Sequence, residues 1–254
     1  MTGAEPGVAG ASVTGSRETV VIDPRFCGPP GTGNGGYVAG LLAARLGGAG
    51  EITLRRPPPV ATALEIVAGA GQSVSLVHGP DLIAEGVAGG PDGPVPAAVA
   101  LAEARAAGAA CRLRAHPEEH PYPGCFVCGP DRGPGDGLGI MVGPVAGRDL
   151  AADVWYPDGS LAGPGGEVAP EFLWAALDCS GGVGAIGNEF QDGPPWVLGR
   201  YAARQAAPVR AGEPHVVVGW RLAVEGRKLL AGSAVFTPAG QLAGLARATW
   251  IQLR

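Results

Sequence analysis

One acidic side chain lies in the most apolar helical segment of the sequence. The segment begins at Pro170, which suits the first turn of a helix because its missing N–H needs no partner there. It continues to Cys179 with almost no polar face, so the helix should be buried on all sides. Asp178 lies within it, and a carboxylate on a buried helix must be paired, protonated or used in a reaction. We expect the following glycines, Gly181 and Gly182, to end the helix.

A second apolar segment begins with residues that can polarise a carbonyl group. Asn34 is a favourable N-cap, and Gly35 and Gly36 begin a helix that extends to Leu46. Backbone N–H groups at a helix start lack partners and lie at the positive end of the helix dipole, and glycine lets a ligand approach them closely. Asn34 can also hold a carbonyl or position a water molecule. The segment is typical of an oxyanion site, with a tight turn between helix and sheet as the alternative.

Four potential zinc ligands lie close together in the middle of the chain. His116 and His120 precede the Cys125-x-x-Cys128 sequence, and both the residue types and the short cysteine spacing suit zinc. Prolines stiffen the segment, however, and the cysteine pair can equally form a turn. We therefore expect no metal ion, with a structural zinc site as the alternative.

Composition limits the classes of protein to which the chain can belong. Its 254 residues suffice for one large domain or two small ones. The formal charge is 18 − 23 = −5, and the lack of a basic run argues against nucleic acid and anionic membranes as partners. Residues 1–16 lack the basic and apolar regions of a secretory signal. Five cysteines, an odd number, favour a reducing cytoplasm over a disulfide framework.

The order of the segments indicates an internal duplication. In the first half a strand precedes the Asn34–Leu46 helix and four strands follow it, and the second half repeats this order around Pro170–Cys179. An antiparallel sheet wrapped around each helix would bury it on every side, so we expect an α+β fold. The expected strands are 18–22, 51–56, 63–68, 73–78, 81–88, 149–156, 197–206, 215–224, 228–236 and 242–253. The expected divisions are a flexible tail at 1–16, a first module at 17–92, a helical and Pro/Gly/Cys-rich linker at 93–137 with a helix at 97–107, and a second module at 138–254.

These motifs, in this order, resemble those of hotdog-fold acyl-CoA thioesterases. Gly33–Gly36 is similar to the family's His-Gly-Gly or Asn-Gly-Gly helix start, which an acid follows nine positions after the His or Asn. Cys125–Gly129 with Gly137–Ile140 is similar to the Cys-x-x-Cys-Gly … Gly-Leu sequence that precedes the first strand in many hotdog proteins. Trp174–Cys179 is similar to the second-half helix of actinobacterial double-hotdog thioesterase-like proteins. The resemblance covers residues of about 15–254 and implies two tandem hotdog modules.

Each half retains a different part of the family's helix motif. Aligning Ala169 with Asn34 places Asp178 opposite Ala43, so only the first helix has the glycines and only the second has the acid. Within one helix the two positions are about 12 Å apart, at ~1.5 Å per residue, too far to act on one thioester. Hotdog sites form across the interface between modules. The resemblance therefore implies one composite site, in which the Asn34 and Gly35 end of the first helix faces Asp178.

The resemblance implies a thioester hydrolase that acts on acyl-CoA or acyl-carrier-protein substrates. The amides of Gly35 and Gly36 would polarise the thioester carbonyl, while Asp178 would act as general base or as nucleophile. CoA is part of the substrate, so we expect no cofactor. Exposed sheet edges, and the association of chains that is common in the resembled family, favour a homodimer. The residues expected to bind substrate are Gly36, Tyr37, Trp174, Cys179, Ser180, Arg55 and Arg56, the two arginines through CoA phosphates.

Other interpretations of these residues stay open. Asp178 can be a structural acid paired with a backbone amide or with Arg200, and Ser180 can donate a hydrogen bond to it. Glu171 suits the positive end of its helix, and the arginine pair can be an exposed strand end. Two alternative functions are a non-catalytic acyl-thioester-binding module and a hotdog hydratase or dehydratase. The latter chemistry pairs a His with an Asp, and only the strand residue His215 could serve.

Overall fold

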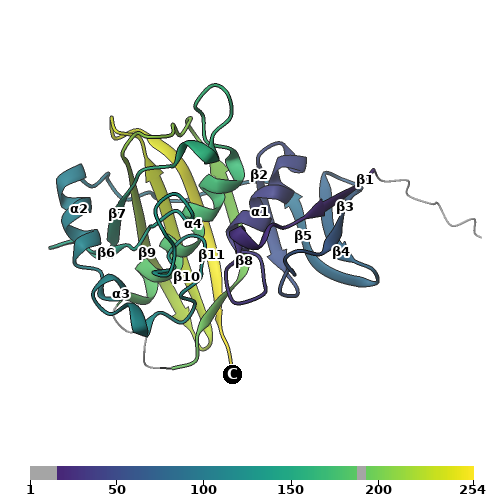
Figure 1. The fold of residues 1–254 in the computed structure, drawn as a ribbon, viewed down its shortest axis with the longest axis horizontal. Helices are drawn as coiled ribbons and strands as arrows, with labels where there is room; N and C mark the ends of the chain where they lie inside the picture. The colour runs from purple at the N-terminus through teal and green to yellow at the C-terminus, as the bar shows by residue number, and fades with distance from the viewer. Residues whose placement is uncertain (1–15, 188–192) are drawn as a thin grey trace, which may run out of the picture.

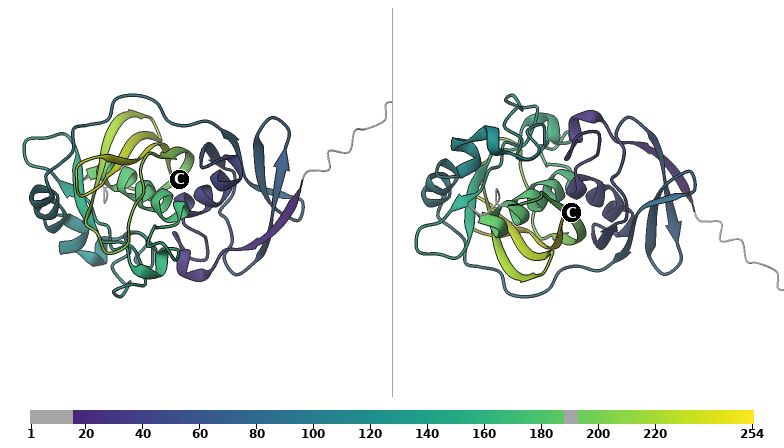
Figure 2. Two further views of the ribbon diagram at one scale, coloured as in Figure 1. Left: turned by 90° about the horizontal axis from the view of Figure 1, so that it is seen from above. Right: turned by 90° about the horizontal axis from the view of Figure 1, so that it is seen from below.

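The computed structural model describes residues 16–187 and 193–254, so nearly all of the predicted tail lies outside the described residues. Figures 1 and 2 show two helices, α1 and α4, side by side in the middle of the molecule with strands on their outer sides. The helices are α1 (Gly35–Ala43), α2 (Leu101–Ala109), α3 (Arg112–Ala115) and α4 (Pro170–Ile186). The strands are β1 (Arg17–Val21), β2 (Ala49–Leu54), β3 (Ala63–Gly69), β4 (Ser73–His78), β5 (Asp81–Ala88), β6 (Gly143–Pro144), β7 (Ala151–Trp155), β8 (Trp196–Gln205), β9 (His215–Glu225), β10 (Lys228–Phe236) and β11 (Leu242–Gln252). None of the described helices is long and apolar enough to cross a membrane.

The strands of both halves join in one antiparallel sheet. Within the described residues the order is β1-β3-β4-β5-β2-β8-β11-β10-β9-β7-β6, and the paired neighbours are antiparallel. The halves meet where β2 pairs with β8, with Ile52 opposite Tyr201. In Figure 1, β1 to β5 lie in the same half of the molecule as α1, and β7 to β11 lie in the same half as α4. That the two halves are tandem hotdog modules stays a prediction.

The two central helices are buried because they have almost no polar face. Every residue of α1 except Leu41 is buried, and the first turn of α1 is fixed as predicted. The Oδ1 atom of Asn34 accepts a hydrogen bond from the Tyr37 N–H at 2.9 Å, which confirms Asn34 as the N-cap. In α4, the carbonyl oxygen of Trp174 accepts a hydrogen bond from the Tyr201 hydroxyl of β8 at 2.8 Å. A side chain of the sheet is thus hydrogen-bonded to the backbone of α4.

The helix α4 is longer than the sequence predicts. The expectation that Gly181 and Gly182 end it is wrong, because the helix continues to Ile186. The second of these glycines lies where α4 packs closely against the sheet. A Cβ on Gly182 would lie 2.5 Å from the ring of Trp250, and a Cβ on Gly219 of β9 would overlap a carbonyl oxygen of α4. Glycine is therefore used here for close packing rather than for helix termination.

Two adjacent glycines of α4 give a direct test of this packing. We expect Gly182→Ala to lower the free energy of unfolding by about 1–3 kcal/mol, because the added methyl group overpacks the contact with Trp250. Gly181→Ala is the matched control, because its Cβ would have no neighbour closer than 3.5 Å. The higher helix propensity of alanine, worth up to roughly 1 kcal/mol, should then stabilise the control or leave it unchanged. Urea denaturation measures both variants, and equal stabilities would contradict the described packing.

Part of the segment predicted as a linker is folded into the protein. Its helix, predicted at 97–107, begins at Leu101, and α2 packs against β7. In the loop that follows, residues Cys125–Cys128 are buried in the main core. The Phe126 N–H donates a hydrogen bond to the carbonyl oxygen of Cys27 at 2.8 Å, which attaches this loop to the segment that leads into α1. The domain boundaries at 92 and 137 stay predictions.

Candidate active site between the central helices

Asp178 of α4 contacts the N-terminus of α1. Its Oδ2 atom accepts a hydrogen bond from the Gly36 N–H at 2.8 Å. The helices approach closely and in antiparallel directions, because Gly36 lies against Asp178 while Gly40, one turn later, lies against Glu171 at the start of α4. A Cβ on Gly40 would be 2.6 Å from the Glu171 Cα. The structure therefore brings together an acid from the second half and a helix start from the first half.

The carboxyl group of Asp178 is buried and only partly paired. It is 2% exposed, and its Oδ1 atom has no hydrogen-bond partner among the described residues. Arg200, the predicted alternative partner, is exposed and lies 3.7 Å from Glu51. The pKa of Asp178 is raised to about 7, mainly by burial of the carboxyl; the Gly36 N–H opposes this rise and the nearby charge of Cys125 adds to it. A carboxyl with this pKa, held at a helix N-terminus, has properties expected of a reactive acid.

Asn34 connects the start of α1 with the cysteine that follows Asp178. Besides capping the helix through Oδ1, it donates a hydrogen bond from Nδ2 to the Sγ atom of Cys179 at 3.6 Å. The nearby Asn34 side chain also lowers the pKa of Asp178, though less than burial raises it. Helix capping is therefore the role seen in the structure, and a role in positioning water or substrate stays a prediction.

The predicted substrate-binding residues of α4 point in different directions. Trp174 is fully buried and packs edge-to-face on Tyr201, with 5.4 Å between ring centroids. Ser180 donates its hydroxyl to the carbonyl oxygen of Ala176 at 2.6 Å. The expected hydrogen bond from Ser180 to Asp178 is therefore wrong, because the hydroxyl instead bonds within its own helix.

The predicted residues of the first half lie in two places. Tyr37, in the first turn of α1, stacks on Phe26 with 4.5 Å between ring centroids. Arg55 and Arg56 directly follow β2, where both side chains are exposed and form ion pairs. Arg55 donates to Glu85 at 2.8 Å, and Arg56 lies 3.1 Å from Asp81. Their position agrees with the alternative interpretation of an exposed strand end, and binding of CoA phosphates stays a prediction.

Three cysteines meet at this end of α4. Cys125 and Cys128 come from the loop, Cys179 comes from α4, and their sulfur atoms all lie within 4.8 Å of one another. Hydrogen bonds with the other two thiols hold the pKa of Cys125 well below its usual range, and the same contacts contribute to raised pKa values of Cys128 and Cys179. The alternative zinc set of two histidines and two cysteines is not assembled, because His116 is exposed beside a glutamate and the ligand atoms that lie together are those of Cys125, Cys128 and Cys179. The third residue beside Cys125 and Cys128 is Cys179, which the sequence analysis did not connect with these two cysteines.

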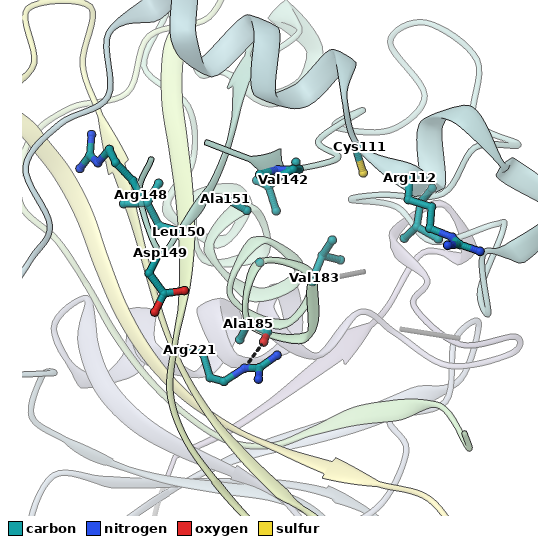
Figure 3. Close-up of a pocket in the computed structure, with 15 residues that line it drawn as sticks. Cys111, Arg112, Val142, Arg148, Asp149, Leu150, Ala151, Val183, Ala185 and Arg221 are labelled. Carbon is teal, nitrogen blue, oxygen red and sulfur yellow. Dashed lines mark hydrogen bonds between the residues drawn. The ribbon is translucent and has the colours of Figure 1, made fainter. Parts of the chain in front are cut away.

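The structure contains two cavities near these elements. One, of about 320 Å³, lies beside the last turns of α4, where the Arg221 side chain donates a hydrogen bond to the carbonyl oxygen of Ala185 at 2.7 Å (Figure 3). The other, of about 680 Å³, lies between the loops at 132–139 and 156–159. Neither of these two cavities borders Asp178, and the 2% exposure of Asp178 shows that the described residues cover the contact between the helices.

No protein-family model and no curated protein matches the chain, but solved structures match it over nearly its whole length. The tesB protein of Mycobacterium avium subspecies paratuberculosis is 11% identical, with a TM-score of 0.60 over 94% of this chain and 93% of that one. An acyl-CoA thioesterase II of Mycobacterium marinum is 12% identical, with a TM-score of 0.58 over 93% of each chain. A protein of Alicyclobacillus acidocaldarius with the hot dog fold is 10% identical, with a TM-score of 0.60 over 96% of this chain and 95% of that one. This chain therefore has the α+β hotdog fold, as the resemblance predicts.

Proposed function

We propose that the chain hydrolyses acyl thioesters of CoA or acyl carrier protein at one composite site between two tandem hotdog modules. The observation that carries this proposal is the carboxyl of Asp178, which is buried at the start of a helix from the other half. One of its oxygens has no hydrogen-bond partner in the part of the chain that the structure describes. Burying an unpaired polar atom costs free energy, and groups of this kind are found preferentially at reactive sites. Two structures with the same fold are named as a tesB protein and an acyl-CoA thioesterase.

The start of α1 would polarise the thioester carbonyl. The first N–H groups of a helix have no acceptor within it, and here Gly36 uses its N–H to hold Asp178. We therefore assign polarisation first to the Gly35 amide, joined by Gly36 when the carboxylate moves to act. A Cβ on Gly35 would lie 3.0 Å from Leu54 and 2.9 Å from Leu198. Apolar side chains of both halves thus border this amide and would contact the acyl group.

Asp178 would supply the second requirement, attack on the carbonyl carbon. As a general base, it takes a proton from water while the water oxygen attacks and the thiolate leaves. As a nucleophile, its oxygen displaces the thiolate to form a mixed anhydride, which water then hydrolyses to regenerate the carboxylate. Both routes use the same carboxyl and the same polarised carbonyl.

The site must open for a substrate to enter. Asp178 and Asn34 are both buried, and the cavities do not reach them, so binding must separate the side chains around the start of α1. Leu54, which borders Gly35, is followed directly by Arg55 and Arg56. These arginines would bind the phosphates of a CoA whose acyl group enters beside Leu54.

Incubation of the purified full chain with a panel of acyl-CoAs tests the proposal. We expect release of free CoA from at least one acyl chain length. Binding without turnover would instead support a non-catalytic acyl-thioester-binding module, the second candidate, which the closed carboxyl favours. Hydration of an enoyl-CoA would support the hydratase. The hydratase has less structural support. Gly35 lies against Leu198 of β8, whereas His215 lies on β9, and β10 and β11 separate these two strands in the sheet.

We also propose that two chains associate in the cytoplasm as a homodimer. The strands β1 and β6 form the two ends of the described sheet, and an unpaired sheet edge is a surface on which another chain can pair. Light scattering of the purified protein would measure a mass of twice 25.3 kDa if this is correct.

A further inference from the structure

The sulfur cluster formed by Cys125, Cys128 and Cys179, here called the three-cysteine cluster, takes no part in the proposed hydrolysis. We propose that this cluster binds one zinc ion through three thiolates. The inference goes beyond the proposed function and departs from the expectation, drawn from the sequence, that the chain binds no metal. It also differs from the alternative set of two histidines and two cysteines, because its third ligand comes from α4.

The distances between the sulfur atoms suit a zinc ion. Zinc–sulfur bonds of about 2.3 Å in a tetrahedral arrangement place sulfur atoms about 3.8 Å apart. The sulfur atoms of Cys125 and Cys179 are 3.7 Å apart, and all three atoms lie within 4.8 Å of one another. A disulfide would need about 2.05 Å, and all three residues are free cysteines. The cluster therefore has the spacing of metal ligands rather than of a covalent pair.

The backbone around the first two cysteines is a tight turn that holds both sulfur atoms in place. The Gly129 N–H donates a hydrogen bond to the carbonyl oxygen of Cys125 at 2.9 Å. A Cβ on Gly129 would lie 2.5 Å from the backbone N and O of Cys125, so glycine is required there. The turn thus presents two prepared sulfur ligands to the third on α4.

The chemistry of the cluster favours zinc among the common metals. Thiolates bind soft and borderline ions, and zinc is four-coordinate in proteins. Three sulfur ligands leave one position for an oxygen or nitrogen ligand. Each thiol loses its proton to solvent as its zinc–sulfur bond forms. The three residues are buried, and the ion would link the loop to α4 at Cys179, the residue next to Asp178. Zinc would therefore hold the part of α4 that carries the acid.

Metal analysis of the full chain tests the inference. The protein is purified under reducing conditions from zinc-supplemented medium, and its zinc content is measured by mass spectrometry. We expect about one zinc per chain, lost in Cys125→Ser and in Cys179→Ser. Cys111→Ser is the matched control, because Cys111 is equally buried and lies outside the cluster, and it should keep the metal. Asp178→Asn should also keep the metal, so this inference and the proposed hydrolysis can fail separately.

Cobalt substitution of the wild-type chain gives a measurement that does not depend on the folding of variants. We expect Co²⁺ added to the zinc-free protein to produce thiolate-to-metal charge-transfer absorption, which saturates at about one ion per chain and is reversed by zinc. Three results would overturn the inference. They are absence of both bound zinc and the cobalt absorption, a disulfide between Cys125 and Cys179 in the purified protein, and zinc retained in Cys179→Ser but lost in His116→Ala.

Discussion

Asp178→Asn is expected to lower kcat for thioester hydrolysis by about 10²–10⁴-fold, the range typical of losing a general acid or base. Asparagine has nearly the same size, and its amide oxygen can still accept the hydrogen bond that the Gly36 N–H now gives to the carboxylate at 2.8 Å. The contact between α1 and α4 should therefore persist. The amide can neither take a proton from water nor attack a carbonyl carbon, so the loss falls on the chemical step. Measuring kcat and KM on the best acyl-CoA of the panel checks this result.

Asp153→Asn is the matched control for this variant. Asp153 on β7 is also a buried carboxyl and accepts hydrogen bonds from the Arg114 side chain and the Met141 N–H, both at 2.8 Å. In the sheet β7 is separated from β8 by β9, β10 and β11. The control should lose stability, because it weakens a charge-assisted pair, and should keep its kcat. Full activity of a folded Asp178→Asn protein would remove the acid from the mechanism.

The strands could be predicted from the sequence because their signals are local. Alternating apolar residues between glycine and proline turns give the observed bounds of β4, β5 and β10 and place the other long strands to within one or two residues. Among the described strands, the two-residue strand β6 alone was missed, because two residues carry no periodic pattern. The cap at Asn34 was also predictable, since its hydrogen bond spans three residues.

Features that depend on contacts between distant residues were harder to predict. Gly181 and Gly182 indicate a helix end by local rules, and only the ring of Trp250 explains why the helix continues past them. The three-cysteine cluster joins Cys125 to a residue 54 positions later. No spacing rule connects cysteines that far apart, although an odd number of cysteines leaves one without a partner.

The contact of Asp178 with the start of α1 was predictable from a different kind of reasoning. Each half of the chain has part of one motif, and the distance along a single helix excludes a site within one half. Pairing the two halves then places the acid against the glycines, which is where the structure has it. The same reasoning could not show that the Gly36 N–H is already used by the carboxylate, or that the site is closed.

Gly36→Ala is expected to lower the free energy of unfolding by about 3 kcal/mol, the upper end of the range for overpacking. Its Cβ would overlap that of Asp178 and lie 2.7 Å from the carbonyl oxygen of Trp174, where about 3.5–4.0 Å is normal between carbon atoms. Backbone cannot rotate away as a side chain can, so α1 and α4 must separate. Urea denaturation beside Gly181→Ala, whose methyl group has room in α4, measures the difference. Equal midpoints for the two variants would show that the helices are not this close.

The kcat of Gly36→Ala shows whether hydrolysis depends on the position of the Asp178 carboxyl as well as on its presence. The variant keeps the carboxyl of Asp178 but displaces it from the amide that now holds it, so kcat should fall even where the protein is fully folded. Asp178→Asn keeps the position and loses the acid, so the two variants should lose activity for different reasons. If folded Gly36→Ala kept full kcat while Asp178→Asn lost it, the start of α1 would have no part in catalysis. The site would then need another group to polarise the carbonyl, because an acid alone does not stabilise the charge that develops on the thioester oxygen.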